Sequence, residues 1–210
     1  MVGHYCMTIG GFMAIIVDKV QKRKDIALTC KELFVQNGIK DITISQIAMT
    51  AGVGKGTLYD YFKNKEDIIF EIVNILIQEH NELKTKKMLD ATSTKEKIKI
   101  FFDFFYNKEE VDLRELYKEL ISITLSEPNS EMIEFHSRCN EEYHSWFNEI
   151  FEEGIKKGEI IEGSKKLLNG LFAFGEGMFI SSCVTNTIDD LQYEIDNFID
   201  TIFDLIEVKK

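Results

Sequence analysis

Residues 43–65 read TISQIAMTAGVGKGTLYDYFKNK, and two short helical patterns separated by glycines stand out in this segment. Thr43 and Gln46 form a capping box, which starts a short helix with its apolar residues on one side. That helix is predicted to end at Ala51-Gly52, and helical spacing resumes from Lys55 to Phe62, with Leu58 and Phe62 turned inward. Two short helices joined by a glycine-containing turn are typical of a helix-turn-helix.

Longer helices are predicted on both sides of this motif. Upstream, apolar residues between Asp18 and Asn37 recur at the helical spacing, and Gly38 supplies a C-terminal stop. Downstream, Asn64 caps a long helix that runs towards Lys87. Residues 1–17 contain no Lys, Arg, Asp or Glu and lack the basic start and cleavage site of a secretory signal. We therefore expect a disordered or extended N-terminus at 1–17.

Charge is distributed unevenly along the chain. The net charge of −11 over 210 residues disfavours a nucleic-acid-binding protein when it is taken alone. Between Asp18 and Lys65, however, nine Lys and Arg stand against five Asp and Glu, a net +4 that leaves −15 for the rest. Polyanion binding needs only a local positive surface, to which Lys22, Arg23 and Lys24 would add non-specific attraction. The alternative is a solvated charge asymmetry without a binding role.

The remainder of the chain also predicts helices. A single Pro and many Leu, Ile, Glu, Lys and Phe residues favour an all-α fold, and 44% hydrophobic residues suffice for a core. No stretch reaches the roughly 20 uninterrupted apolar residues of a membrane span, so no membrane contact is expected. The further helices are expected at about 94–106, 109–125, 129–157, 164–184 and 189–208.

The sequence shows no sign of an enzyme. Gly52 to Thr57 resembles a phosphate-binding loop only superficially, because the spacing is wrong and the segment follows a helix instead of a strand. We expect no catalytic residue, no cofactor and no metal. The cysteines lack CxxC or Cys/His zinc spacing and are expected to be buried, reduced thiols of a cytosolic protein; they are Cys6, Cys30, Cys139 and Cys183.

The motif resembles the DNA-binding domain of the tetracycline-repressor (TetR) family, through ALTCKELF at 27–34, TISQIA at 43–48 and AGVGKGTLYDYFKNK at 51–65. The resemblance implies an all-α protein of about nine helices. A three-helix helix-turn-helix DNA-binding domain would occupy 18–66, and a helical effector-binding and dimerisation domain 67–210. It also implies a cytoplasmic repressor that binds a palindromic operator as a dimer and is released by a small-molecule inducer. A helix-turn-helix protein without an effector, acting as an architectural protein or co-regulator, is the alternative.

The candidate DNA contacts lie on and around the second helix of the motif. That helix enters the major groove in helix-turn-helix proteins, so Lys55 at its start reaches base edges or a phosphate. Thr43 can offer its hydroxyl to a phosphate beside its capping role. Asp60 would accept from cytosine or belong to the surface only, and the resemblance adds the two tyrosines and Lys65. The set is Thr43, Lys55, Gly56, Thr57, Tyr59, Asp60, Tyr61 and Lys65.

The second half carries no distinctive motif, and its assignment follows from the resemblance and from composition. Residues 167–180 are too apolar and too rich in small residues for an exposed helix, and we expect a homodimer through 164–208. Small-molecule sites are mostly apolar and aromatic, although aromatics at helical spacing are more often plain core. The expected partner is a small apolar ligand, or a cationic one if Glu176 lies among aromatic rings. The candidate ligand-binding residues are Phe102, Phe105, Tyr106, Tyr143, Trp146, Phe174 and Glu176.

Overall fold

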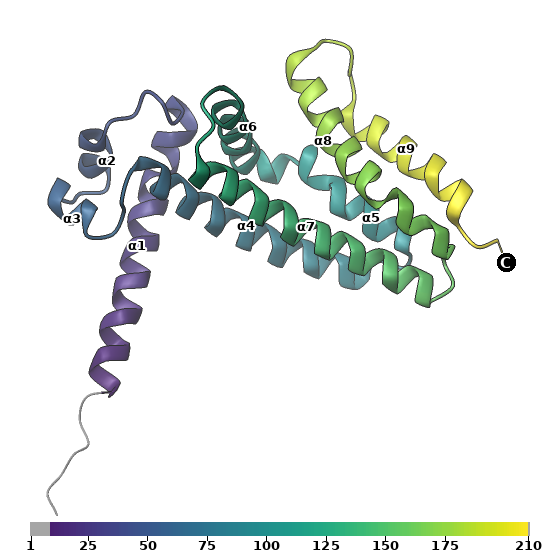
Figure 1. Ribbon diagram of the computed structural model, residues 1–210, viewed down its shortest axis with the longest axis horizontal. Helices are drawn as coiled ribbons and strands as arrows, with labels where there is room; N and C mark the ends of the chain where they lie inside the picture. The colour runs from purple at the N-terminus through teal and green to yellow at the C-terminus, as the bar shows by residue number, and fades with distance from the viewer. Residues whose placement is uncertain (1–8, 210) are drawn as a thin grey trace, which may run out of the picture. The chain divides into compact units, whose positions relative to one another are not determined.

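The computed structural model describes residues 9–209, which are mainly α-helical (Figure 1). This part of the chain contains nine α-helices, three short 3-10 helices and no strand, only an isolated bridge between Ile160 and Glu207. The expected all-α class of about nine helices is confirmed. The elements are α1 Ile9–Asn37, α2 Ile44–Thr50, α3 Lys55–Tyr59, α4 Lys65–Asp90, α5 Thr94–Phe102, η1 Asp103–Phe105, η2 Lys108–Glu110, α6 Val111–Ser126, α7 Ser130–Lys156, η3 Glu162–Leu167, α8 Leu168–Val184 and α9 Leu191–Ile206.

The first of two compact units comprises the chain up to Gln78 together with Glu115–Glu119 of α6. Its core is built from the apolar stripes of α1 to α4, and Gly38 ends α1 with a φ of 70°, a conformation that suits glycine. Directly after it, the Ile39 amide donates to the Glu119 carboxylate at 3.0 Å. The unit therefore extends past the expected boundary at 66. Its buried residues include Ile26, Cys30, Phe34, Ile47, Leu58, Phe62 and Ile69.

The second unit comprises Glu79–Arg114 and the chain from Leu120 onward. Here α5 packs against α7 and α9, and α8 packs against α7, α9 and η3. Its core is strongly aromatic because α5 and α7 both direct phenylalanines inward. The buried residues include Ile98, Phe101, Phe102, Phe147, Phe151, Ile195, Ile199 and Phe203.

Some boundaries differ from the sequence expectations. α1 begins at Ile9 instead of Asp18, so residues 9–17, expected to be disordered or extended, are helical, while 1–8 lie outside the described residues. α5 ends at Phe102, and the following residues up to Glu110 form the tighter turns η1 and η2. A 3-10 turn repeats every three residues and an α-helix every 3.6, so apolar spacing over one turn does not separate the two.

Helix α8 leaves much apolar surface uncovered within one protomer. Among the described residues, Glu162–Val184 is the one segment long and apolar enough to cross a membrane by length and composition, with a mean hydropathy of 1.4. Only 17% of its most apolar window is buried, and Ile180 and Val184 are exposed. Apolar surface of this kind marks a place of contact with another protein or a membrane.

The cysteines that the structure describes are free thiols. Burial raises the pKa of Cys30 to about 11, as expected for a buried thiol. The expected burial is wrong for Cys183, which is exposed near the end of α8, and Cys139 is only half-buried. Cys6 lies outside the described residues. Over residues 9–209, no group of His, Cys, Asp and Glu is placed to hold a metal ion.

Candidate nucleic-acid interface

The caps of α2 form as the sequence predicts. The Thr43 hydroxyl accepts from the Gln46 amide at 3.3 Å, and the Gln46 side chain accepts from the Thr43 amide at 2.9 Å. This reciprocal capping box fixes where α2 starts. After α2, Gly52 adopts a φ of 65°, which glycine tolerates best, and the chain turns into α3.

Helix α3 divides its residues between core and surface. Leu58 is buried, as is Phe62 just after the helix, so their predicted inward orientation is confirmed. The three residues before Leu58 and the two directly after it are exposed, and Tyr59 keeps 56% of its surface exposed although it is large and aromatic. We call this exposed set the α3 surface; it consists of Lys55, Gly56, Thr57, Tyr59 and Asp60.

Arg23 of α1 connects three parts of the first unit. Its guanidinium donates to the backbone carbonyl of Tyr61, immediately after α3. It also pairs with Asp67 at 2.7 Å and with Glu71 at 2.9 Å, both in the first turns of α4. The guanidinium carbon lies 4.3 Å from the centroid of the Phe62 ring. Arg23, expected to add non-specific attraction for DNA, is instead engaged inside the unit.

The charges of this ion pair stabilise one another. Burial lowers the pKa of Arg23, but hydrogen bonds from its guanidinium to Asp67 and Glu71 outweigh burial and raise it overall. Burial likewise raises the pKa of Asp67, but the hydrogen bonds that it accepts from Arg23 and from the Lys63 amide hold it below its ordinary value. Both groups are therefore charged at neutral pH, and α1 is held to α4 by a charge-assisted contact.

Lys65 has an equally internal role. Its ammonium donates to the backbone carbonyls of Ile39 at 2.8 Å, Lys40 at 2.9 Å and Ile42 at 3.4 Å. A lysine has three N–H donors, so these carbonyls account for all of them. Lys65 thus ties the start of α4 to the loop before α2, and its contact with a phosphate stays a prediction.

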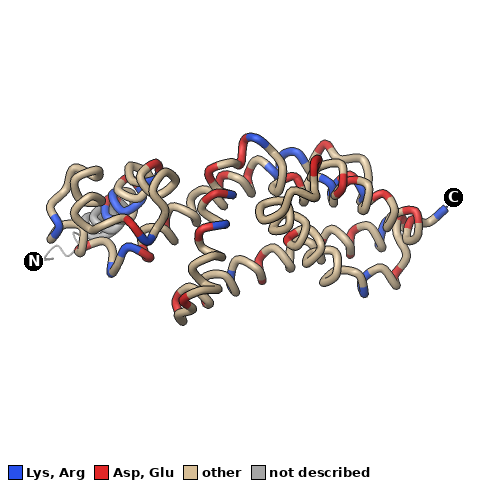
Figure 2. The backbone as a smooth tube through the Cα atoms, turned by 90° about the horizontal axis from the view of Figure 1, so that it is seen from above, with Lys and Arg blue, Asp and Glu red and all other residues tan. Residues whose placement is uncertain are grey.

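The exposed lysines are the cationic groups of the first unit that remain available to a polyanion, since Arg23 and Lys65 act internally. Figure 2 shows Lys and Arg along the helices of the first unit and many Asp and Glu along those of the second. Tyr61 is half-buried, with the Lys19 ammonium 5.8 Å from its ring centroid. The exposed lysines of the first unit include Lys19, Lys22, Lys40, Lys55 and Lys63.

The candidate ligand-binding residues belong to the second unit. Phe102 is part of the aromatic core, and the other candidate aromatics are half-buried against that core. The Phe174 ring stacks on Phe198 with 3.7 Å between centroids. Glu176 is half-buried on α8, and its charge partly offsets the lowering by burial of the His136 pKa. Their role in ligand binding stays a prediction.

Two polar clusters were not expected from the sequence. One is the Arg23 ion pair; the spacing of Asp67 and Glu71, four residues apart on one helix, was the available signal. The other lies around His80 and Lys84, which continue the apolar stripe of α4 at helical spacing and are buried. A polar residue on an apolar stripe signals a buried polar contact but does not identify its partner.

Residues 29–72 match the family described as "Bacterial regulatory proteins, tetR family". The chain is similar to the fatty acid metabolism regulator protein of Bacillus subtilis, with 28% identity over 179 residues that cover 83% of this chain and 88% of the relative. It is also similar to the transcriptional regulator QacR of Staphylococcus aureus, with 28% identity over 61% of this chain and 68% of the relative.

Solved structures share the fold. A transcriptional regulator from Saccharomonospora viridis, in complex with choline, aligns with a TM-score of 0.73 at 14% identity and covers 90% of this chain and 100% of its own. The fatty acid degradation regulator FadR from Bacillus halodurans aligns with a TM-score of 0.65 at 21% identity, over 87% of this chain and 94% of its own. At these identities the likeness concerns the fold alone.

The variants Arg23→Met and Lys55→Ala distinguish a residue that positions α3 from one that contacts DNA. Without Arg23, two part-buried carboxylates lose their partner, and the free energy of unfolding should fall by about 1–3 kcal/mol. Lys55→Ala changes an exposed side chain and should alter it by less than about 0.5 kcal/mol. Both variants should bind duplex DNA more weakly. Only Lys55→Ala should lower the slope of log affinity against log salt, by at most about 0.9, the value for the loss of one phosphate contact.

Urea unfolding and fluorescence anisotropy with a labelled duplex at several salt concentrations measure these quantities. The positioning role of Arg23 would be contradicted by a salt slope that Arg23→Met lowers as much as Lys55→Ala does.

Proposed function

We propose that the chain is a transcriptional regulator of the TetR family of bacterial regulatory proteins and not an enzyme, and that it acts as a cytoplasmic, ligand-responsive repressor whose homodimer binds a palindromic operator. A small-molecule inducer releases it from that operator. The observation that carries the proposal is the α3 surface, where polar side chains and Tyr59 are exposed on a short helix whose other side is buried.

The chemistry of the α3 surface suits the major groove. A groove about 12 Å wide admits a helix, and at its floor guanine presents the acceptors O6 and N7 to a lysine. Lys55 stands at the first position of α3, from which it reaches base edges or a phosphate. Thr57, Tyr59 and Asp60 extend the contact along the helix. Thr43 and Tyr61 complete the proposed interface from its flanks, and Lys65 holds the start of α4 beside it through the carbonyls of the loop before α2.

The homodimer is supported by apolar surface that one protomer leaves open on α8 and α9. Ile180, Val184 and Leu205 are exposed although they are apolar. At Gly170 and Gly177 of α8, an added Cβ would meet nothing within 4 Å in the protomer, so a second helix could approach closely there. A dimer through 164–208 would cover this surface. Its two α3 helices would then read two half-sites about 34–36 Å apart on a palindrome.

The continuity of α4 supports the proposed release by a ligand. This helix starts at Lys65 in the first unit and ends at Asp90 in the second, and Arg23 links its first turns to the carbonyl of Tyr61. A ligand that displaces α4 would therefore change the placement of α3. It must bind the DNA-incompetent state more tightly, because equal affinity for both states shifts no equilibrium.

The proposed inducer site lies in the second unit. A small apolar or cationic molecule would contact Phe102, Phe105, Tyr106, Tyr143, Trp146, Phe174 and Glu176. Support comes from similar proteins, since one relative is named for fatty acid metabolism and one structural neighbour contains choline. A helix-turn-helix protein without an effector is the alternative, and it predicts that no small molecule changes the affinity for DNA.

Selection on random duplex DNA tests the proposed function. We expect the wild-type protein to enrich a palindrome. A variant with Lys55→Ala and Tyr59→Ala should enrich none, because both side chains leave the α3 surface while the buried Leu58 and Phe62 remain. Circular dichroism of both proteins controls for folding. Failure of the intact wild-type dimer to enrich any sequence at low salt would contradict the proposal.

Leu205→Glu tests the dimer surface. Leu205 is 73% exposed on α9, and a carboxylate there should split the dimer because its charge would be buried against the partner. Leu125→Glu is the matched control, since Leu125 is 79% exposed on α6, outside 164–208. Sedimentation velocity should show monomers for Leu205→Glu and dimers for the control and the wild type. Dimers for both variants would exclude this surface as the interface.

A further inference from the structure

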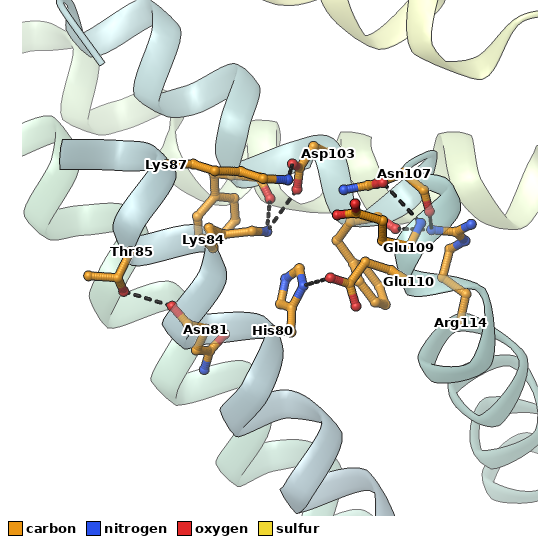
Figure 3. A network of polar contacts seen from close by, with 12 residues as sticks. His80, Asn81, Lys84, Thr85, Lys87, Asp103, Asn107, Glu109, Glu110 and Arg114 are labelled. Carbon is orange, nitrogen blue, oxygen red and sulfur yellow. Dashed lines mark hydrogen bonds and ion pairs between the residues drawn. The ribbon is translucent and has the colours of Figure 1, made fainter. Parts of the chain in front are cut away.

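A buried polar cluster in the second unit joins α4 to the segment between α5 and α6 (Figure 3). His80 Nδ1 lies 2.8 Å from the Glu110 carboxylate of η2. One turn further along α4, the Lys84 ammonium donates to the Phe101 carbonyl at 2.7 Å and lies 3.6 Å from the Asp103 carboxylate of η1. We call His80, Lys84, Asp103 and Glu110 the α4 cluster.

The α4 cluster is costly to bury. His80 and Lys84 are each only 3% exposed, and burial lowers the pKa of Lys84 to about 8. Charged groups held in a protein interior stabilise a fold less than well-packed apolar side chains of similar size would. Buried ionisable groups with displaced pKa values are for this reason candidates for a functional role.

His80 contains an acceptor without a donor. Burial and the nearby Lys84 charge lower the pKa of His80, so the imidazole is neutral at pH 7. Glu110 can only accept, and therefore Nδ1 carries the proton and Nε2 carries the lone pair. His80 Nε2 is buried and has no hydrogen-bond partner among the described residues. Buried acceptors are normally paired, so this atom calls for a donor.

The charges around His80 determine whether a charged or a neutral hydrogen-bond donor can be buried beside it. The carboxylates of Asp103 and Glu110 are balanced by the ammonium groups of Lys84 and of Lys87, which lies 3.2 Å from Asp103. A further charge of either sign would be buried without compensation. The walls are apolar: the Phe104 ring stands edge-on to His80 at 5.5 Å, and the Phe101 ring lies 5.3 Å from the Lys84 ammonium.

We propose that the α4 cluster anchors the polar end of the inducer, and that the inducer is an apolar molecule whose neutral head group donates a hydrogen bond to His80 Nε2. This inference rests on the proposed function, since it names the ligand class of a ligand-responsive regulator. It narrows that class to alcohols and comparable neutral donors, and it excludes carboxylates and quaternary ammonium compounds from this anchor. Because His80 and Lys84 belong to α4, the anchored head group contacts the helix that leads to the first unit.

Four probes with similar tails and different heads test the class of ligand. n-Octanol donates a hydrogen bond, methyl heptyl ether only accepts one, octanoate is an anion, and octyltrimethylammonium is a cation without a donor. In calorimetry with the full-length protein, we expect n-octanol to bind at least tenfold more tightly than each of the others. Equal affinity for the alcohol and the ether would overturn the proposal.

The proton–nitrogen correlation spectrum of the histidine rings reports on the acceptor directly. We expect an unprotonated Nε2 at His80 whose resonance shifts on addition of n-octanol but not of the ether. The His80 signal is assigned by its loss in His80→Phe. A resonance already typical of a hydrogen-bonded nitrogen and unchanged by the alcohol would assign solvent to this acceptor and overturn the proposal.

His80→Phe removes the acceptor and keeps a ring beside Phe104. It should abolish the preference for n-octanol over the ether, and the ratio of the two affinities is the readout because a general weakening of binding affects both probes alike. His136→Phe is the matched control, because His136 Nε2 is also buried without a hydrogen-bond partner in the described chain. Loss of the preference in His136→Phe with retention in His80→Phe would overturn the assignment to the α4 cluster.

DNA binding and probe binding are measured in separate experiments, so the ligand anchor and the proposed function can fail independently. Anisotropy with the enriched duplex measures DNA binding without reference to the probes. A protein that binds its palindrome but shows no preference for the alcohol remains a regulator without this anchor. A protein that shows the preference at His80 but enriches no DNA sequence retains the anchor and loses the proposed function.

Discussion

The ion pair between Arg23 and the two carboxylates of Asp67 and Glu71 is the contact on which the first unit depends. It joins α1 to the first turns of α4, and the same guanidinium binds the carbonyl that follows α3. The five-residue α3 is too short to be stable by itself, because helix formation is cooperative and isolated short helices are marginal. Its placement therefore comes from Leu58 and Phe62 below it and from Arg23 at its end.

A consequence is that the basic residues of the first unit divide into two kinds. Arg23 binds carboxylates and Lys65 binds backbone carbonyls within the unit. Lys55 and its exposed neighbours remain available to a polyanion. For this reason, the number of Lys and Arg in the sequence overstates how many positive groups the surface of the first unit offers to a polyanion. The same holds for α4 in the second unit, where the Asp103 carboxylate balances the charge of the buried Lys84. One helix thus carries a polar cluster in each unit.

The sequence predicted what depends on local periodicity and capping. The box at Thr43, the inward Leu58 and Phe62 and the long α7 all follow from neighbours in the chain. It did not predict η1 and η2, whose spacing imitates an α-helix, or the start of α1 at Ile9. The contacts of Arg23, Lys65 and His80 join residues between 23 and 48 positions apart, and no local pattern specifies such partners. The roles of the ligand-binding candidates stay predictions, because aromatic residues at helical spacing serve a core and a ligand site equally.

Photo-crosslinking from α3 tests the central claim most directly. Benzoylphenylalanine replaces Thr57 on the α3 surface in one protein and the exposed Thr187, between α8 and α9, in another. Each protein is irradiated with the palindromic duplex enriched by the wild type. We expect adducts from position 57 that map to bases within each half-site, and none from position 187. Adducts from position 187 together with none from position 57 would contradict it, because DNA would then meet the protein elsewhere than at α3.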